Sequence, residues 1–291
     1  MHNRLYEKHP PFFIQVFGWS RVGKTVFLYA LTLMLVRMSK VWPEFSHAAV
    51  TDASQEYVQK IHKYLSSGGM PDMTPLGGGE IYMMLLNNME RWGGRTLVMR
   101  DCAGEIFDNL EVPKEQAPFL LNAPTTFMLI SLDDLQDSGG RSMDMLMNNY
   151  VNTLMKNDVN FKKERRKIVV VLTKADRILD LPPNLRNYLM TDPFWAAVNS
   201  PDEVKPMRAE DMEEYMEAMG RVSDATRRWI ERQPFGLNFL NLAKSKNIEL
   251  RFSLISSTGG PVDANNQMSV ALAPRRVLDP YFWALDLQSR N

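Results

Sequence analysis

One short segment near the start of the chain constrains the possible folds most strongly. Residues 18–25 have the order Gly-Trp-Ser-Arg-Val-Gly-Lys-Thr, which matches the phosphate-binding pattern of a glycine, four residues, a glycine, a lysine and a serine or threonine. Apolar residues at 12–17 favour a strand before this segment, and a longer run at 26–38 favours a helix after it. A loop between a strand and a helix can direct its backbone N–H groups at a phosphate. The segment is therefore predicted to be a P-loop.

The residues of this predicted loop have different parts in holding a nucleotide. Gly18 and Gly23 allow the backbone to curl around the phosphates, and Lys24 brings a positive charge to the β and γ phosphates. Thr25 would offer its hydroxyl to Mg²⁺. The other nucleotide-binding residues predicted in the loop are Ser20, Arg21 and Val22.

Composition limits the classes of protein to which the chain can belong. With 291 residues, 45% of them hydrophobic, the chain can bury a large core. Its 34 basic and 34 acidic residues balance, so no overall charge attracts nucleic acid or a membrane. The single cysteine, Cys102, excludes an internal disulfide and favours a reducing compartment. Because no stretch has the pattern of a signal peptide or a membrane span, we expect a cytoplasmic protein.

Further apolar runs alternate with helical patterns along the chain. Besides 12–17, predicted strands lie at 80–88, 95–100, 125–132, 167–173 and 249–256. The double glycine at 93–94 indicates a hairpin, which would add an antiparallel edge, whereas helices between the other strands indicate parallel pairing. We expect one α/β domain over residues 1–291, with a mainly parallel six-stranded sheet, one antiparallel strand and helices on both faces. A helical excursion at about 178–246 would precede the last strand, and Pro280 would break or bend a final helix at 274–285.

A second motif follows the predicted strand 95–100. Asp101 and Gly104 have the spacing Asp-x-x-Gly, in which the aspartate would hold Mg²⁺ through water and the glycine N–H would contact the γ-phosphate. The same spacing recurs at Asp137–Gly140, but that copy lies in a polar loop where no carboxylate could be aimed at a metal. The first copy is therefore the predicted site, and Cys102 within it is interpreted as a packing residue.

A third motif, Thr173-Lys174-Ala175-Asp176, ends another predicted strand and can read guanine. The Asp176 carboxylate would accept hydrogen bonds from the guanine N1–H and 2-amino group, a donor pair that adenine lacks. The Lys174 side chain can cover the base, and Thr173 leads the motif. Ser256 and Ser257 follow the last strand, where a backbone N–H could contact the guanine O6.

With these motifs the sequence resembles the P-loop GTPases of the Ras and Arf kind, because four of their five signatures occur in order between residues 18 and 259. The Gly/Pro-rich loop before the hairpin and the Pro-rich final helix are similar to those of bacterial Ras-like double-GTPases. The resemblance implies GTP and GDP as ligands, Mg²⁺ as cofactor and a protein effector or activator as partner. We expect no nucleic-acid partner, because the basic and acidic residues balance.

The fifth signature of these GTPases is a threonine that contacts both Mg²⁺ and the γ-phosphate. We expect it in the Gly/Pro-rich segment 66–79, where Thr74 is the preferred candidate. Thr51 is the alternative, but it precedes a predicted helix and lies far along the chain from the hairpin.

The sequence departs from the family where the catalytic glutamine is expected, since this position is Glu105. A carboxylate beside the γ-phosphate would repel it, or could act as a general base, so hydrolysis that depends on Lys24, Gly104 and Glu105 is expected to be slow. The alternatives are a nucleotide-binding interaction module that does not hydrolyse GTP, and a P-loop ATPase or kinase, against which residues 173–176 argue. Arg21 could stabilise charge in the transition state, but a solvent-facing side chain is preferred.

A basic run at 162–167 could indicate a membrane or nucleic-acid site. No interleaved aromatic residues or lipidation signal accompany it, so we interpret the run as a solvated loop.

Overall fold

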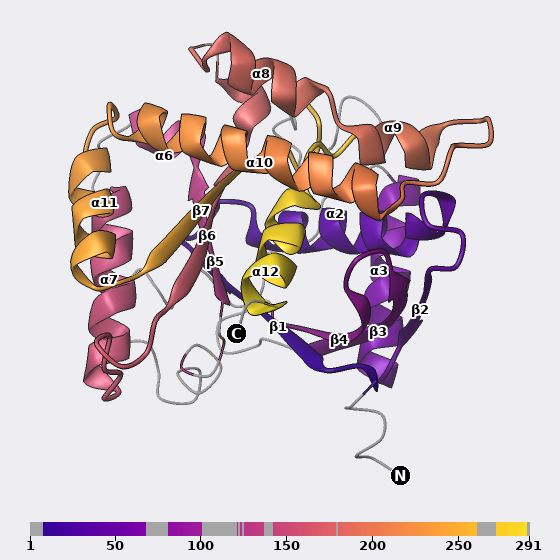
Figure 1. Cartoon of the computed structure of the whole chain (residues 1–291), viewed down its shortest axis with the longest axis horizontal. Coiled ribbons are helices and arrows are strands. Elements are labelled where there is room, and N and C mark those ends of the chain that lie inside the picture. The colour runs from indigo at the N-terminus through magenta and orange to yellow at the C-terminus, as the bar shows by residue number, and fades with distance from the viewer. Residues whose placement is uncertain are drawn as a thin grey trace.

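A seven-stranded sheet with helices on both faces forms the centre of the protein (Figure 1). The computed structural model describes residues 8–67, 81–100, 121, 123, 125–136, 142–178, 180–260 and 272–289. The strands are β1 (Pro11–Phe17), β2 (Ser46–Ala49), β3 (Ile81–Met89), β4 (Gly93–Arg100), β5 (Thr125–Ser131), β6 (Lys167–Thr173) and β7 (Glu249–Leu254). Their order across the sheet is β2-β3-β4-β1-β5-β6-β7.

One strand runs against all the others. β3 is antiparallel to both of its neighbours, β2 and β4, whereas β4, β1, β5, β6 and β7 pair in parallel. The α/β class and the single antiparallel strand predicted from the sequence are therefore confirmed. Because the parallel strands all point the same way, the loops that follow β1, β6 and β7 lie along one edge of the sheet.

The predicted count of six strands is corrected by β2, which the sequence did not suggest. This strand has four residues, and Ser46, His47 and Ala48 are all exposed, so it has no apolar run. Its pairing with β3 makes it a strand, in a register that places Ala48 opposite Leu85. The hairpin of β3 and β4 is therefore not the edge of the sheet, because β2 covers it.

The helices largely follow the expected pattern. They are α2 (Lys24–Val36), α3 (Asp52–Ser67), α6 (Leu132–Gln136), α7 (Met143–Lys156), α8 (Pro183–Met190), α9 (Pro193–Asn199), α10 (Ala209–Ile230), α11 (Gly236–Ser245) and α12 (Asp279–Ser289), with 3-10 helices η1 (Met38–Lys40) and η2 (Ala175–Arg177). Helices α8 to α11 lie between β6 and β7, where the helical excursion was expected. None of the helices in the described part of the chain is long and apolar enough to cross a membrane.

The expectation for the final helix was wrong in two respects. The helix begins at Asp279 instead of Pro274, and Pro280 occupies its first turn, so it neither breaks nor bends the helix. A proline is tolerated there because the first N–H groups of a helix have no intrahelical acceptor. Upstream, Arg275 forms an isolated β-bridge with Ser256.

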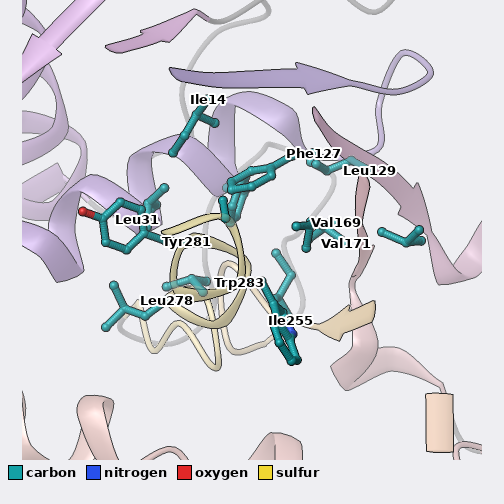
Figure 2. Packing of buried hydrophobic residues seen from close by; sticks show 14 of the residues in the cluster. Ile14, Leu31, Phe127, Leu129, Val169, Val171, Ile255, Leu278, Tyr281 and Trp283 are labelled. Atoms are coloured by element: carbon teal, nitrogen blue, oxygen red, sulfur yellow. The ribbon is translucent and has the colours of Figure 1, made fainter. Parts of the chain in front are cut away.

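The hydrophobic core lies on both faces of β1, β5 and β6. On one face Leu31 of α2 and Tyr281 of α12 pack near Phe127 and Val169, as Figure 2 shows. On the other face Tyr150 of α7 makes an edge-to-face contact with Phe17, with ring centroids 5.5 Å apart, and hydrogen-bonds to Thr126 of β5. The β-strands of a parallel sheet covered on both faces have continuous apolar sequences, which is why β5 and β6 were identifiable.

The basic run at 162–167 is only partly solvated, which corrects the interpretation of a solvated loop. Lys162, Lys163 and Arg165 are exposed, but Arg166 is buried and donates from its guanidinium to the Leu121 carbonyl over 2.7 Å. Lys167 is also buried, and its ammonium donates to the Leu287 carbonyl. These two cations belong to the core because β6 begins there and backbone carbonyls accept their hydrogen bonds.

A buried polar cluster, which we call the Arg276 cluster, joins the helical excursion to the start of α12. It consists of Arg276, Asp279, Tyr188, Tyr215 and Asp192. The Asp279 carboxylate is 2% exposed and accepts hydrogen bonds from the hydroxyls of Tyr188, at 2.6 Å, and of Tyr215. Burial raises the pKa of both tyrosine hydroxyls well above its ordinary value, so both stay protonated and can donate.

The Asp279 carboxyl group should make the stability of the protein depend on pH. Burial raises its pKa from 3.8 to about 6, although the Arg276 guanidinium and the two tyrosine hydroxyls act in the opposite direction. The folded protein therefore binds this proton more tightly than the unfolded chain does. The protonated Asp279 carboxyl group contributes about 3 kcal/mol to the free energy of unfolding. This contribution is fully present below pH 4 and is lost as the pH rises to about 6.

We predict that Asp279→Asn removes this loss from the pH profile of the free energy of unfolding. Urea unfolding between pH 4 and 7 measures the profile. The matched control is Asp202→Asn, which changes an exposed aspartate and should have the same pH profile as the parent. A profile in Asp279→Asn that falls as steeply as that of the parent would show that Asp279 does not titrate in this range.

Candidate nucleotide-binding site

The loop between β1 and α2 needs its two glycines for different physical reasons. Gly23 has a φ of 90°, in the left-handed region, and apart from its chain neighbours no described residue lies within 4 Å of where a Cβ would be. Gly18 lies so close to β5 that a Cβ would be 2.6 Å from the Leu129 carbonyl oxygen. The backbone conformation of Gly23 and the close packing of Gly18 are therefore both restricted to glycine. That this loop binds a phosphate stays a prediction.

A buried ammonium group lies at this loop. Lys24 is the first residue of α2 and is only 6% exposed. Its Nζ donates to the carbonyl oxygens of Gly18, at 3.1 Å, and Trp19, at 2.7 Å. The N-terminus of α2 adds the partial positive charge of its free N–H groups. Lysine and helix together make this loop suitable for a phosphate group.

The other residues of the loop differ in exposure. Arg21 is exposed, as preferred from the sequence, and has a left-handed φ of 66°. Ser20 and Thr25 are half-buried, and Val22 is fully buried. Trp19 is also buried, so the large side chain at this position packs in the core.

The segment predicted to read the base is attached directly to the P-loop. The hydroxyl of Thr173, at the end of β6, donates to the Val22 carbonyl over 2.7 Å. Lys174 has a φ of 57°, and its Nζ bonds to the Asp133 carboxylate at 3.2 Å. Asp176 lies in η2, is exposed, and has no hydrogen-bond or ion-pair partner among the residues that the structure describes. Its carboxylate is available to accept hydrogen bonds from a ligand.

The loop after β7 lies next to this segment. The Ala175 N–H donates to the Ile255 carbonyl over 3.1 Å. Ser256 is fully buried, and its hydroxyl accepts from the Gly259 N–H over 2.9 Å, so this side chain shapes the loop. Ser257 is half-buried and stays a predicted contact of the base. The structure therefore brings together residues 18–25, 173–176 and 255–257.

Four predicted site residues lie outside the described residues: Thr74, Asp101, Gly104 and Glu105. Their roles stay predictions, as does the preference between the two Asp-x-x-Gly copies. Arg100, which precedes Asp101, is the last residue of β4 and is opposite Gln15 of β1. Thr51 is described: its Oγ1 accepts from the Ser54 N–H over 3.2 Å at the start of α3, which is a capping interaction.

Asp133 is a residue of the site that the sequence analysis missed. Its carboxylate holds Lys174 and also lies 3.7 Å from the guanidinium of Arg177. Two adjacent acidic residues directly after the strand at 125–132 were the available signal. Their significance depends on the neighbouring positions of β5 and β6, which a linear sequence does not show.

The geometry of the loop leads to a prediction for its lysine. Lys24→Ala should weaken binding of a nucleoside triphosphate about ten- to hundredfold, because a hydrogen bond from a charged group contributes about 1.5–3 kcal/mol. Calorimetry in Mg²⁺ buffer measures the affinity. Lys40→Ala, which removes an exposed charge beyond α2, is the matched control and should bind as the parent does. Equal affinities in all three proteins would remove Lys24 from the phosphate site.

Comparison with known proteins identifies the family. No curated protein matches the chain significantly. The model of the family described as Double-GTPase 2 matches residues 12–233, from β1 to just beyond α10. The match includes the P-loop and residues 173–176 but ends before the loop after β7. The family description names a GTPase, a class of protein that binds GTP. The chain therefore belongs to the Double-GTPase 2 family.

Proposed function

We propose that the protein is a GTP-dependent switch that binds GTP with Mg²⁺ and slowly hydrolyses it to GDP and phosphate. The observation that carries this proposal is the hydrogen bond from the Thr173 hydroxyl to the Val22 carbonyl. It attaches the segment that bears Asp176 to the phosphate-binding loop. One nucleotide could then contact both.

The two ends of this site suit the two ends of a guanine nucleotide. At one end, Lys24 and the first N–H groups of α2 favour the phosphates. At the other end, the exposed Asp176 carboxylate can accept from the N1–H and the 2-amino group of guanine. Adenine offers no such donor pair, which makes an ATPase or a kinase the poorer interpretation.

The residues around the start of α2 fit a magnesium ion. Thr25 places a hydroxyl oxygen one residue after the phosphate lysine, and oxygen ligands are those that Mg²⁺ prefers. Asp101 follows Arg100 in the sequence, and Arg100 is the last residue of β4, the neighbour of β1. We infer that Thr25, Asp101 and Thr74 would hold the ion, which would neutralise charge on the phosphates.

The hydrolysis and switch parts of the proposal rest on the sequence. Thr74 and Gly104 would contact the γ-phosphate, which GTP has and GDP lacks, so an effector or activator protein could distinguish the two states. Glu105 stands where a glutamine would orient the attacking water. This substitution is also the reason to keep a second candidate function, a GTP-binding interaction module that does not hydrolyse its ligand.

Selectivity for guanine is tested with Asp176→Asn. Two hydrogen bonds to a carboxylate contribute about 3–6 kcal/mol together, so GTP affinity should fall by about two to four orders of magnitude. The asparagine NH₂ faces the guanine 2-amino group donor to donor, whereas xanthine has a carbonyl there. Competition binding should therefore show that the variant prefers XTP to GTP.

The control for this experiment is Asp180→Asn, which changes an exposed aspartate nearby and should keep the parent's preference for GTP. If Asp176→Asn ranks GTP above XTP as the parent does, Asp176 does not read the base. The proposal of a GTP-specific site then loses its support.

The role of Glu105 is tested by Glu105→Gln in single-turnover phosphate release. If Glu105 only positions water poorly, the glutamine should raise the rate of hydrolysis, and if Glu105 is the general base, it should lower the rate. A rate equal to that of the parent would remove Glu105 from the reaction. No phosphate release from either protein would favour the interaction module.

A further inference from the structure

The loop after β7 is held by a second segment that precedes α12. Ser256 and Arg275 exchange both backbone hydrogen bonds, at 3.1 and 2.7 Å, and the Ala273 N–H donates to the Thr258 carbonyl over 2.9 Å. Gly259 has a left-handed φ of 76°, and a side chain there would collide with the Ala273 carbonyl. The conformation of the loop after β7, residues 255–260, therefore depends on where residues 273–275 lie. We call these residues 255–260 the base-side loop.

The next residue along the chain, Arg276, is bound to the helical excursion by both backbone and side chain. Its backbone N–H donates to the Asp192 carboxylate over 2.6 Å, and Asp192 also caps α9. Its guanidinium donates to the carbonyl oxygens of Tyr188, at 2.9 Å, and Thr191, and to the Tyr215 hydroxyl at 3.0 Å. The Arg276 side chain thus bonds to acceptors from α8, from the turn after it and from α10.

Three features show that this arrangement is specific. Arg276 is only 5% exposed and has a left-handed φ of 57°, which is unfavourable for a residue with a long side chain. Its guanidinium also lies over the Tyr188 ring, 3.6 Å from the centroid. The planar fork of arginine can satisfy three acceptors and stack on a ring at once, whereas lysine cannot.

Asp279 completes the cluster from the first turn of α12. Because its carboxylate accepts from Tyr188 and Tyr215, the same two tyrosines contact both Arg276 and Asp279. Figure 1 shows α8, α9 and α10 along one margin of the fold, with the start of α12 next to α10. The segment 273–279 is thus held by the helical excursion on one side and holds the base-side loop on the other.

We propose that Arg276 and Tyr215 are positioning residues for the loop 255–260, so that helices α8 to α10 set the affinity of the site for the base of its nucleotide. This inference rests on the proposed guanine-nucleotide site. It extends that site to helices that contain none of its predicted residues. The path runs from Tyr215 to Arg276, through the adjacent Arg275 to Ser256, and so to the loop beside Asp176.

The effect should have a signature that distinguishes it from a loss of phosphate binding. GTP and GDP share the same base, so weakening the cluster should raise both dissociation constants by the same factor. The preference for GTP over ATP should also become smaller, because adenine has an amino group where guanine has the O6 that a backbone N–H of this loop would contact. A cluster that only stabilises the fold would lower the midpoint of thermal unfolding and leave both constants unchanged well below that temperature.

The first variant is Tyr215→Phe. It removes the hydroxyl that accepts from Arg276 and donates to Asp279, and it keeps the ring that packs edge to face on Phe194 and Phe282. We expect both dissociation constants to rise about tenfold, which is about 1.4 kcal/mol. Tyr150→Phe is the matched control, because it removes the buried hydroxyl that contacts Thr126 and should leave both constants unchanged.

The second variant, Arg276→Lys, keeps the charge but loses the fork, and it serves if Tyr215→Phe does not fold. It should likewise raise the dissociation constants of GTP and GDP by one common factor. Hydrogen exchange at the amides of Ser256 and Gly259, measured without nucleotide, gives a second readout. Exchange there should be faster in Tyr215→Phe and Arg276→Lys than in Tyr150→Phe.

These measurements separate the inference from the proposed function. If the parent protein binds no guanine nucleotide, the proposed function is wrong, and exchange still decides whether the cluster positions the loop. Exchange and affinities equal to those of Tyr150→Phe would overturn the inference. Faster exchange with unchanged affinities in a protein that does bind GDP would overturn it as well, because the loop would then not control base affinity.

Discussion

The hydrogen bond between the Thr173 hydroxyl and the Val22 carbonyl joins two halves of the site that lie far apart in the sequence. It can form because β6 is separated from β1 only by β5, and the three strands pair in parallel. Backbone hydrogen bonds between the strands set their separation, and apolar residues from α2, α12 and α7 cover both faces of the sheet there. The site therefore depends on the packing of the sheet, although its polar groups lie in loops.

Hydrogen bonds between buried polar groups also position α8, α9 and α10 relative to the start of α12. The Arg276 cluster places an arginine, two aspartates and two tyrosines in the interior, where unpaired polar groups are costly. Their mutual hydrogen bonds are satisfied in one arrangement of α8, α9, α10 and the start of α12. Hydrophobic packing alone would tolerate small shifts of these helices, whereas the directional hydrogen bonds do not. The helical excursion is thereby placed relative to the segment that holds the loop after β7.

The corrections to the sequence analysis have two causes. β2 was missed because an exposed edge strand needs a partner, here β3, more than it needs apolar residues. Arg166 and Lys167 were assigned to solvent because a run of charges is usually solvated, but carbonyl oxygens from distant segments accept their hydrogen bonds. Pro280 was expected to disturb a helix that in fact begins one residue before it. In each case the deciding partner is distant in sequence or the helix boundary was misplaced.

The sequence by itself determined the chemistry of the loop 18–25, the buried strands of the sheet and the residue set at 173–176, since each depends on neighbouring residues in the chain. Glycines, apolar runs and caps act over a few residues, and such signals can be found without a structure. Only the tertiary structure decided that Thr173 contacts Val22, that Asp133 holds Lys174 and that Arg276 links three helices to the base-side loop. These contacts join residues separated by tens of positions or more, and their geometry is set by how strands pair and helices pack.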